Sequence, residues 1–247
     1  MHGLAGHAEE WSATAAWLSE DRHVFALDLR GHGRSEQRPT IVSPTALAED
    51  VSFALEAIGG APALLIGQSL GGRIAIPVAA TRPELVGCLV VAEAGPDGGP
   101  DGAARKATEV GAALERWPVP FPDRSAAEAF FGGPSPRAEA WTRGLRPGPD
   151  GLHRRFEVDV VTRMLRDVAA RDCWEEWSRI DCPTLIVRGG DGEIPDGEAA
   201  RMRSDRPDAR YVELPGVGHE VHLEKIDLWR AAVSRFLEEV ATRGARA

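Results

Sequence analysis

Short apolar runs alternate with longer amphipathic segments along most of the chain. Runs rich in aliphatic and β-branched residues predict buried strands at Val24–Leu29, Ala63–Gly67, Cys88–Ala92, Thr184–Val187 and Ala209–Leu214. Helical periodicity with suitable start and stop residues predicts helices at Glu9–Ser19, Pro44–Ile58, Leu70–Thr81, Glu198–Ser204 and about Glu224–Ala241. This alternation of strands and helices predicts an α/β fold with a doubly wound, mostly parallel sheet.

The pattern is interrupted over residues 96–178. This stretch lacks a strand pattern and is broken by Gly- and Pro-rich sequences at 95–102, 132–136 and 146–151. We therefore expect a helical insertion at 96–178, with the core formed by residues 1–95 and 179–247. The insertion is rich in tryptophan and phenylalanine, which we expect to form a small core of its own. Trp174 and Trp177 are candidates for lining an apolar binding pocket.

Composition is that of an ordinary globular protein. The 247 residues are 43% hydrophobic, and 29 basic against 38 acidic residues give a net charge of −9. No basic stripe indicates a nucleic-acid or anionic-membrane partner, and nothing in the pattern indicates an oligomeric state. Cys88, Cys173 and Cys182 lack metal-ligand spacing, so we expect free thiols, no metal and no cofactor. The sequence has no membrane-length apolar run and no leader-like start, so we expect a cytoplasmic protein. We expect its Arg- and Ala-rich end to fray from Thr242.

The most specific local signal is the sequence Gly-Gln-Ser-Leu-Gly at 67–71. It directly follows the predicted strand Ala63–Gly67 and directly precedes the predicted helix Leu70–Thr81. A serine at such a sharp turn occupies a strained backbone conformation, and the flanking glycines remove side chains that would crowd it. The spacing and its flanks predict that Ser69 is a nucleophile at the edge of the sheet.

With this motif, the chain resembles the α/β-hydrolase superfamily. Three further stretches are similar to motifs of that family: His-Gly-Leu-Ala-Gly at 2–6, Asp-Leu-Arg-Gly-His-Gly-Arg-Ser at 28–35, and Gly-Val-Gly-His-Glu-Val-His at 216–222. The resemblance covers nearly all of the chain outside residues 96–178, which would form a cap over the hydrolase core. It implies a serine hydrolase.

A serine hydroxyl needs a base to remove its proton, and a histidine is the usual one. The resemblance places this base at His219, in a loop of small residues after the strand pattern Ala209–Leu214. His222 is the alternative, but it falls where the last helix is expected to begin.

The acid that would orient the histidine has candidates at two positions in the sequence. Many family members carry it after the strand matched here by Thr184–Val187, where Asp191 and Glu193 are candidates, although the usual aspartate register falls on or beside Gly192. Certain lactonases of the family place it at the end of the preceding strand, where this chain has Glu93. A carboxylate at the end of a buried strand needs a partner, and a histidine would supply one. We favour Glu93.

For the oxyanion that forms during acyl transfer, the resemblance implies two backbone amides, those of Leu70 and Leu4. Family members have further strands before the His-Gly loop, whereas Met1 alone precedes His2 in this sequence. We therefore expect the N-terminal strands of the fold to be missing, which places Leu4 close to the terminus.

The leading hypothesis is hydrolysis of a carboxylic ester or lactone of a moderately apolar small molecule, through an acyl-serine intermediate. Other reactions of the superfamily are alternatives by analogy: carbon–carbon bond hydrolysis, thioester hydrolysis and cofactor-free haloperoxidase chemistry. A different class is a ligand-binding receptor that keeps a vestigial hydrolase site. The complete set of Ser69, His219 and a carboxylate favours an enzyme.

Overall fold

The computed structural model describes residues 1–244. The end that we expect to fray begins at Thr242, and its last residues, 245–247, lie outside the described residues. The chain divides into two compact units. The first contains residues 1–47 and 98–172, and the second contains residues 48–97 and 173–247. The second unit therefore holds Ser69, Glu93 and His219, the three residues that we favour as nucleophile, acid and base.

A parallel four-stranded sheet forms the centre of the second unit, with strand order β1-β2-β5-β6. The strands are β1 (Ala63–Gln68), β2 (Val86–Ala92), β5 (Thr184–Gly189) and β6 (Arg210–Leu214). Residues 89–92 of β2 are all fully buried, as expected for a strand with helices on both faces of its sheet. Because all four strands run in the same direction, the segments that follow them meet at one edge of the sheet.

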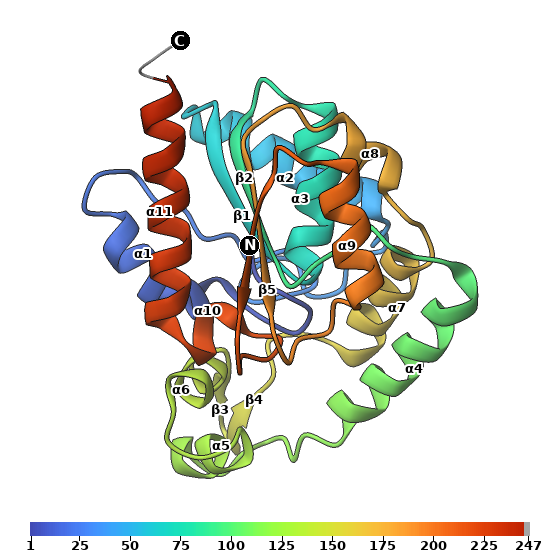
Figure 1. Ribbon diagram of the computed structural model, residues 1–247. Helices are drawn as coiled ribbons and strands as arrows, with labels where there is room; N and C mark the ends of the chain where they lie inside the picture. Colours follow the sequence, from blue (N-terminus) through green and yellow to red (C-terminus); the bar gives the residue numbers. More distant parts are fainter. Residues whose placement is uncertain (245–247) are drawn as a thin grey trace. The chain divides into compact units, whose positions relative to one another are not determined.

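Helices cover both faces of this sheet (Figure 1). One face carries α11 (Ile226–Gly244), whose buried Trp229, Val233 and Phe236 recur at helical spacing. The opposite face carries α3, α8 and α9 (Figure 1). The helices of this unit are α2 (Pro44–Ile58, most of which lies here), α3 (Leu70–Thr81), α8 (Trp174–Arg179), α9 (Asp196–Asp205), α10 (Val221–Glu224) and α11.

The first unit is mainly helical. Its elements are the 3₁₀ helix η1 (Ala8–Trp11), α1 (Ser12–Leu18), α4 (Pro100–Glu115), α5 (Arg124–Phe130), α6 (Pro136–Arg143), α7 (Val158–Ala169) and a hairpin of β3 (Arg146–Gly148) and β4 (Gly151–His153). The α4 and α7 helices lie side by side (Figure 1), and Gly111 allows close approach to Thr162. The side chains of Asp123 and Ser135 cap α5 and α6 by accepting hydrogen bonds from their first turns.

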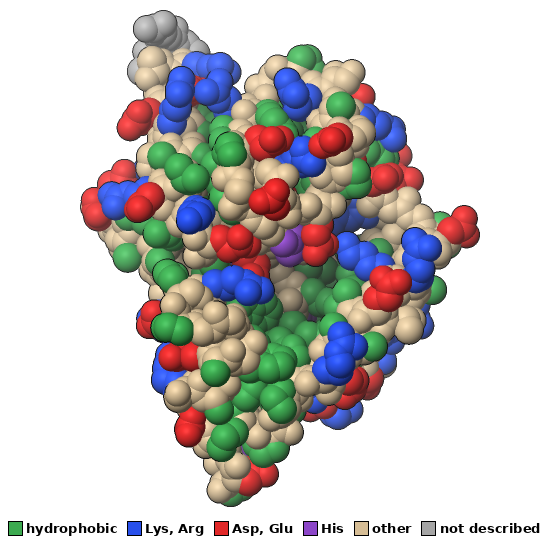
Figure 2. All heavy atoms as spheres, turned by 60° about the horizontal axis from the view of Figure 1, so that its bottom comes forward, with side chains coloured by type: hydrophobic (Ala, Val, Ile, Leu, Met, Phe, Trp, Pro, Cys, Tyr) green, Lys and Arg blue, Asp and Glu red, His purple; other side chains and the backbone are tan. Residues whose placement is uncertain are grey.

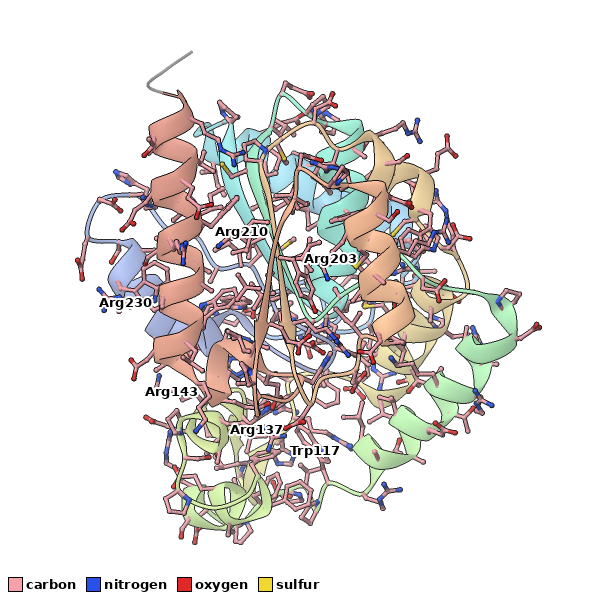
Figure 3. All side chains as sticks on the ribbon, in the orientation of Figure 1. Trp117, Arg137, Arg143, Arg203, Arg210 and Arg230 are labelled. Carbon is pink, nitrogen blue, oxygen red and sulfur yellow. The ribbon has the colours of Figure 1, made fainter. Side chains whose placement is uncertain are left out.

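Aromatic side chains form a core of their own in the first unit, as the insertion's composition predicts. Trp117, labelled in Figure 3, contacts the rings of Phe130, Phe131, Trp141 and Phe156 at centroid separations of 4.9–6.2 Å. Hydrophobic side chains also gather on the face that carries α5 and α6 (Figure 2), where Phe130 is 43% exposed.

The α/β class and the parallel sheet are as predicted, whereas two local predictions are wrong. Residues Val24–Leu29 are not a β-strand, because the first unit offers them no ladder partner and its strands β3 and β4 pair with each other. A side chain satisfies part of this segment instead, as the Leu29 amide donates to His2 Nε2 at 2.9 Å. Within the insertion, the Gly- and Pro-rich stretch at 146–151 belongs to a hairpin rather than a break between helices. No helix in residues 1–244 combines the length and hydropathy needed to span a membrane.

Candidate active site

Ser69 lies on the sharp turn between β1 and α3. Its backbone has φ 50° and ψ −115°, a left-handed φ that a residue with a side chain rarely adopts. The amide of Ser69 donates to the carbonyl of Ala92 at 2.9 Å, which ties this turn to the end of β2. Side chains at Gly67 and Gly72 would collide with neighbouring atoms, so the two glycines permit the close approach of strand and helix. The turn presents a half-buried serine at the edge of the sheet.

Leu70 is the first residue of α3, a helix of 12 residues. Amides of a first helical turn have no acceptor within their own helix, and the helix dipole makes this end positive. An oxygen that becomes negative beside Ser69 would meet favourable charge there.

Glu93 follows β2 directly and is only 2% exposed. Its backbone also has a left-handed φ, 47°. The carboxylate accepts three hydrogen bonds: Oε1 from the Gly189 amide at 2.7 Å, and Oε2 from the Glu193 amide at 2.7 Å and from His219 Nδ1 at 3.1 Å. These donors satisfy a buried carboxylate that would otherwise be costly to desolvate.

Gly192 stands against this carboxylate. A Cβ built on Gly192 would overlap the carboxylate atoms of Glu93, so the Glu93 side chain fills the space beside the loop where many family members carry their aspartate. A glycine at this position is therefore compatible with an acid on the neighbouring strand. An aspartate could not occupy Gly192 while Glu93 keeps its present position.

His219 lies in the loop between β6 and α10, and contacts on both sides hold the backbone of this loop. Gln68 Nε2, from the residue before Ser69, donates to the His219 carbonyl at 2.9 Å. The Glu224 carboxylate accepts from the amides of Gly218 and Glu220 at 2.8 and 3.0 Å. The residues that flank His219 are thus fixed by one side chain. Sequence reasoning did not single out Gln68, Glu224 or Gly192 for these roles.

The surroundings of His219 favour its protonated form. Burial of the ring opposes protonation, but the hydrogen bond with Glu93 and the negative charges of Glu193, Glu93 and Glu220 outweigh burial and raise the pKa of His219. A carboxylate bound to Nδ1 also keeps the proton of the neutral ring on that nitrogen. Nε2 is then free to accept a proton.

The other acid and base candidates lie in different surroundings. The Asp191 side chain is exposed, and its amide donates to Val217. The Glu193 side chain is also exposed, and this residue contacts the Glu93 carboxylate through its amide. The ring of His222 is buried, with its centroid 6.4 Å from that of Trp229 in α11. The carboxylate of Glu93 accepts the hydrogen bond from the ring of His219.

Leu4 belongs to the first unit, in a tight loop held by two buried histidines. The amide of Ala5, which has φ 61°, donates to His32 Nε2 at 3.1 Å. His2 and His32 lie 4.9 Å apart between ring centroids. Burial lowers the pKa of His32 to about 4, despite nearby carbonyls and acids, and lowers that of His2 well below its usual value. Both rings are neutral acceptors at neutral pH. The oxyanion role of Leu4 stays a prediction.

The geometry gives no support to the binding role expected for Trp174 and Trp177. Both belong to α8 in the second unit rather than to the insertion's aromatic core. Trp177 is fully buried and donates to the Met202 carbonyl at 3.2 Å, so a ligand cannot reach it. Trp174 is 9% exposed and stacks under Arg201, whose guanidinium carbon is 3.7 Å from its ring centroid. Both side chains join helices of one unit.

Comparisons with known proteins show the family and the fold. The model of the family described as alpha/beta hydrolase fold matches residues 1–226. Esterase YbfF of Escherichia coli is 28% identical, in an alignment that covers 97% of this chain and 92% of that protein. The 2-(acetamidomethylene)succinate hydrolase of Mesorhizobium japonicum is 26% identical, with 96% of this chain and 86% of that protein covered.

Solved structures show the same similarity. The crystal structure of E-2-(acetamidomethylene)succinate hydrolase superposes with a TM-score of 0.84 at 26% identity, covering 96% of this chain and 89% of that one. A thioesterase domain from the curacin biosynthetic pathway superposes with a TM-score of 0.76 at 24% identity, which is evidence for the fold alone.

Proposed function

Because this chain belongs to the α/β-hydrolase family, we propose that it hydrolyses a carboxylic ester or lactone of a moderately apolar small molecule, with Ser69 as nucleophile. Relatives named esterases and hydrolases support a hydrolase that cleaves esters. The observation that carries the serine mechanism is the hydrogen bond from His219 Nδ1 to the buried Glu93, in the unit that holds Ser69 on its strained turn.

In the first half-reaction, Ser69 Oγ attacks the carbonyl carbon while His219 Nε2 takes the hydroxyl proton. The carbon–oxygen bond to the leaving group then breaks, and His219 returns the proton to the departing alkoxide. In the second half-reaction, His219 deprotonates a water that attacks the acyl-serine, and the proton finally returns to Ser69. Glu93 stays ionised, holds the Nδ1 proton and stabilises the imidazolium that forms in each half.

The developing oxyanion needs donors in place before the reaction. We assign these to the amides of Leu70 and Leu4, with a contribution of about 3 kcal/mol each. The first amide begins α3, and the second lies in the loop held by His32. The side chains at these two positions are not required for this role.

An active-site fluorophosphonate probe tests the nucleophile. We expect stoichiometric labelling of the folded protein, loss of labelling in Ser69→Ala, and unchanged labelling in Ser204→Ala, a matched change at an exposed serine of α9. A panel of 4-nitrophenyl esters and lactones then tests turnover. A folded wild-type protein that takes up no probe would contradict the role of Ser69. Labelling without turnover of any ester or lactone would instead favour a ligand-binding receptor.

A further inference from the structure

The loop between β5 and α9, residues 190–195, contacts the proposed acid through its backbone. The amide of Glu193 donates to Glu93 Oε2 at 2.7 Å, the same oxygen that accepts the hydrogen bond from His219 Nδ1. The position of Glu193 therefore helps to orient this oxygen. Displacement of the loop would remove a donor from a carboxylate that is only 2% exposed, and the side chain would be less well oriented towards the base.

The two halves of this loop are held by different kinds of contact. In the first half, the amide of Gly190 donates to the carbonyl of Leu214, the last residue of β6, at 2.8 Å. In the second half, a side chain supplies the contact, as Arg188 Nε donates to the Ile194 carbonyl at 3.0 Å. Ile194 directly follows Glu193 in the chain. The hydrogen bond from the arginine therefore fixes the backbone one residue beyond the amide that binds the acid.

Arg188 is itself held in place by acidic side chains. It lies on β5 opposite Glu213 of β6 in the strand register, and its Nη1 is 3.1 Å from Glu213 Oε2. The Tyr211 hydroxyl donates to the same carboxylate oxygen at 2.8 Å. Nη2 is 2.6 Å from Oδ1 of Asp196, the first residue of α9. Each nitrogen of the guanidinium thus meets a different partner, which the rigid plane of its five N–H donors makes possible.

We infer that Arg188 is a positioning residue for the proposed acid, Glu93. It fixes the second half of the loop, and the loop presents the Glu193 amide to the acid, which orients His219. The inference rests on the proposed function, because it gives Arg188 a role in the reaction of Ser69. Arg188 acts through the acid and the base rather than on the substrate. Its loss should therefore lower kcat and leave KM nearly unchanged.

Kinetics of Arg188 variants test this role. Arg188→Met keeps an apolar stem, and we expect kcat on 4-nitrophenyl esters to fall roughly 10- to 100-fold, with KM changed less than about 3-fold. Arg188→Lys should recover part of the loss, because it restores the charge but not the planar set of donors. Arg206→Met is the matched control. Arg206 also donates to a carboxylate, that of Asp208, and to a backbone carbonyl, that of Cys182, but this carbonyl precedes β5. We expect Arg206→Met to lower stability without changing kcat.

A double-mutant cycle separates positioning of the acid from a general structural defect. If Arg188 acts through Glu93, adding Arg188→Met to Glu93→Gln should lower kcat by less than about 3-fold, because the carboxylate that the loop orients is already absent. A defect that does not pass through Glu93 would instead multiply with the loss in Glu93→Gln. Full multiplication of the two losses would refute the inference.

Amide hydrogen exchange followed by NMR tests the contact without any turnover. In Arg188→Met, we expect the Glu193 amide to exchange roughly 10-fold faster or more, and the Gly190 amide, which donates to the backbone of β6, to exchange at an unchanged rate. This result without turnover of any ester by the wild-type protein would retain the contact between Arg188 and the loop and refute the hydrolase proposal. Unchanged exchange of the Glu193 amide in folded Arg188→Met would refute the inference, and turnover by the wild-type protein would still support the hydrolase proposal.

Discussion

Replacing Glu93 by glutamine tests the proposed acid without changing its shape. The carboxylate faces donors at both oxygens, the Gly189 amide at Oε1 and the Glu193 amide with His219 Nδ1 at Oε2. A glutamine must turn its NH₂ group towards one side or the other. Either orientation sets a donor against a donor, and leaves at least one backbone N–H without an acceptor. We therefore expect a loss of about 1–3 kcal/mol in the free energy of unfolding.

The effect on catalysis is expected to be larger. With the NH₂ group towards Gly189, His219 keeps its tautomer but loses the negative charge that stabilises its protonated form. With the NH₂ group towards His219, the ring is driven to the tautomer that carries its proton on Nε2, and it cannot act as a base. The two cases together predict a fall in kcat/KM of roughly 10² to 10⁴-fold.

The assay is the pH dependence of 4-nitrophenyl ester hydrolysis, with urea unfolding as a check that each variant is folded. Asp191→Asn is the matched control, because it makes the same chemical change at an exposed carboxylate nearby, and we expect less than about a 3-fold effect. Activity of folded Glu93→Gln within about 10-fold of wild type would refute the reasoning. A large loss in Asp191→Asn would move the acid to the later loop.

Gly192→Ala provides a second variant that leaves every charge in place. The added methyl group overlaps the Glu93 carboxylate, which must move away from His219. We expect a lower kcat, whereas the fluorophosphonate probe should still label Ser69. Gly197→Ala is the control, because a Cβ there meets nothing within 4 Å.

The remaining predictions concern the loops and the histidines. Glu224→Ala is expected to lower kcat/KM by about 10- to 100-fold, by releasing the amides on both sides of His219, with partial recovery in Glu224→Gln; equal activity of all three proteins would contradict this. The neutral form of His219 is the active base, and its pKa is raised, so we expect activity to fall with decreasing pH through an apparent pKa above 6.5. In Glu193→Gln, which removes one of the negative charges that raise this pKa, the apparent pKa of the activity profile should be lower. The pKa of His32 is lowered to about 4 in the folded protein, so the unfolded state binds more protons than the folded state between about pH 4 and pH 6.5. The contribution of His32 to stability is therefore complete above pH 6.5 and falls as the pH decreases below it. The loss amounts to about 3 kcal/mol at most, and urea unfolding at pH 7 and pH 5 should show a weaker pH dependence in His32→Gln than in wild type.

Much of the second unit was predictable from the sequence, because its elements depend on local patterns. The predicted helices Pro44–Ile58 and Leu70–Thr81 have the bounds seen in α2 and α3, and the predicted strands match β1, β2, β5 and β6 to within two residues. The turn at Ser69 was equally local, since a strand, a serine between glycines and a helix follow one another within a few residues. The first unit was less predictable. The segment Val24–Leu29 has a strand-like composition, but a strand also requires a partner whose hydrogen bonds complete the ladder.

The acid of the site depends on tertiary structure. Glu93 and His219 are 126 residues apart, and only the order and register of the strands bring their side chains together. The sequence by itself reduced the acid to three carboxylates and favoured Glu93. The structure adds that the Glu93 carboxylate occupies the space next to Gly192, where a side chain would collide with it. Sequence determined which residues can do the chemistry because it sets their side chains and local turns; the fold decided which of them meet, because distances between distant segments follow from packing and strand pairing.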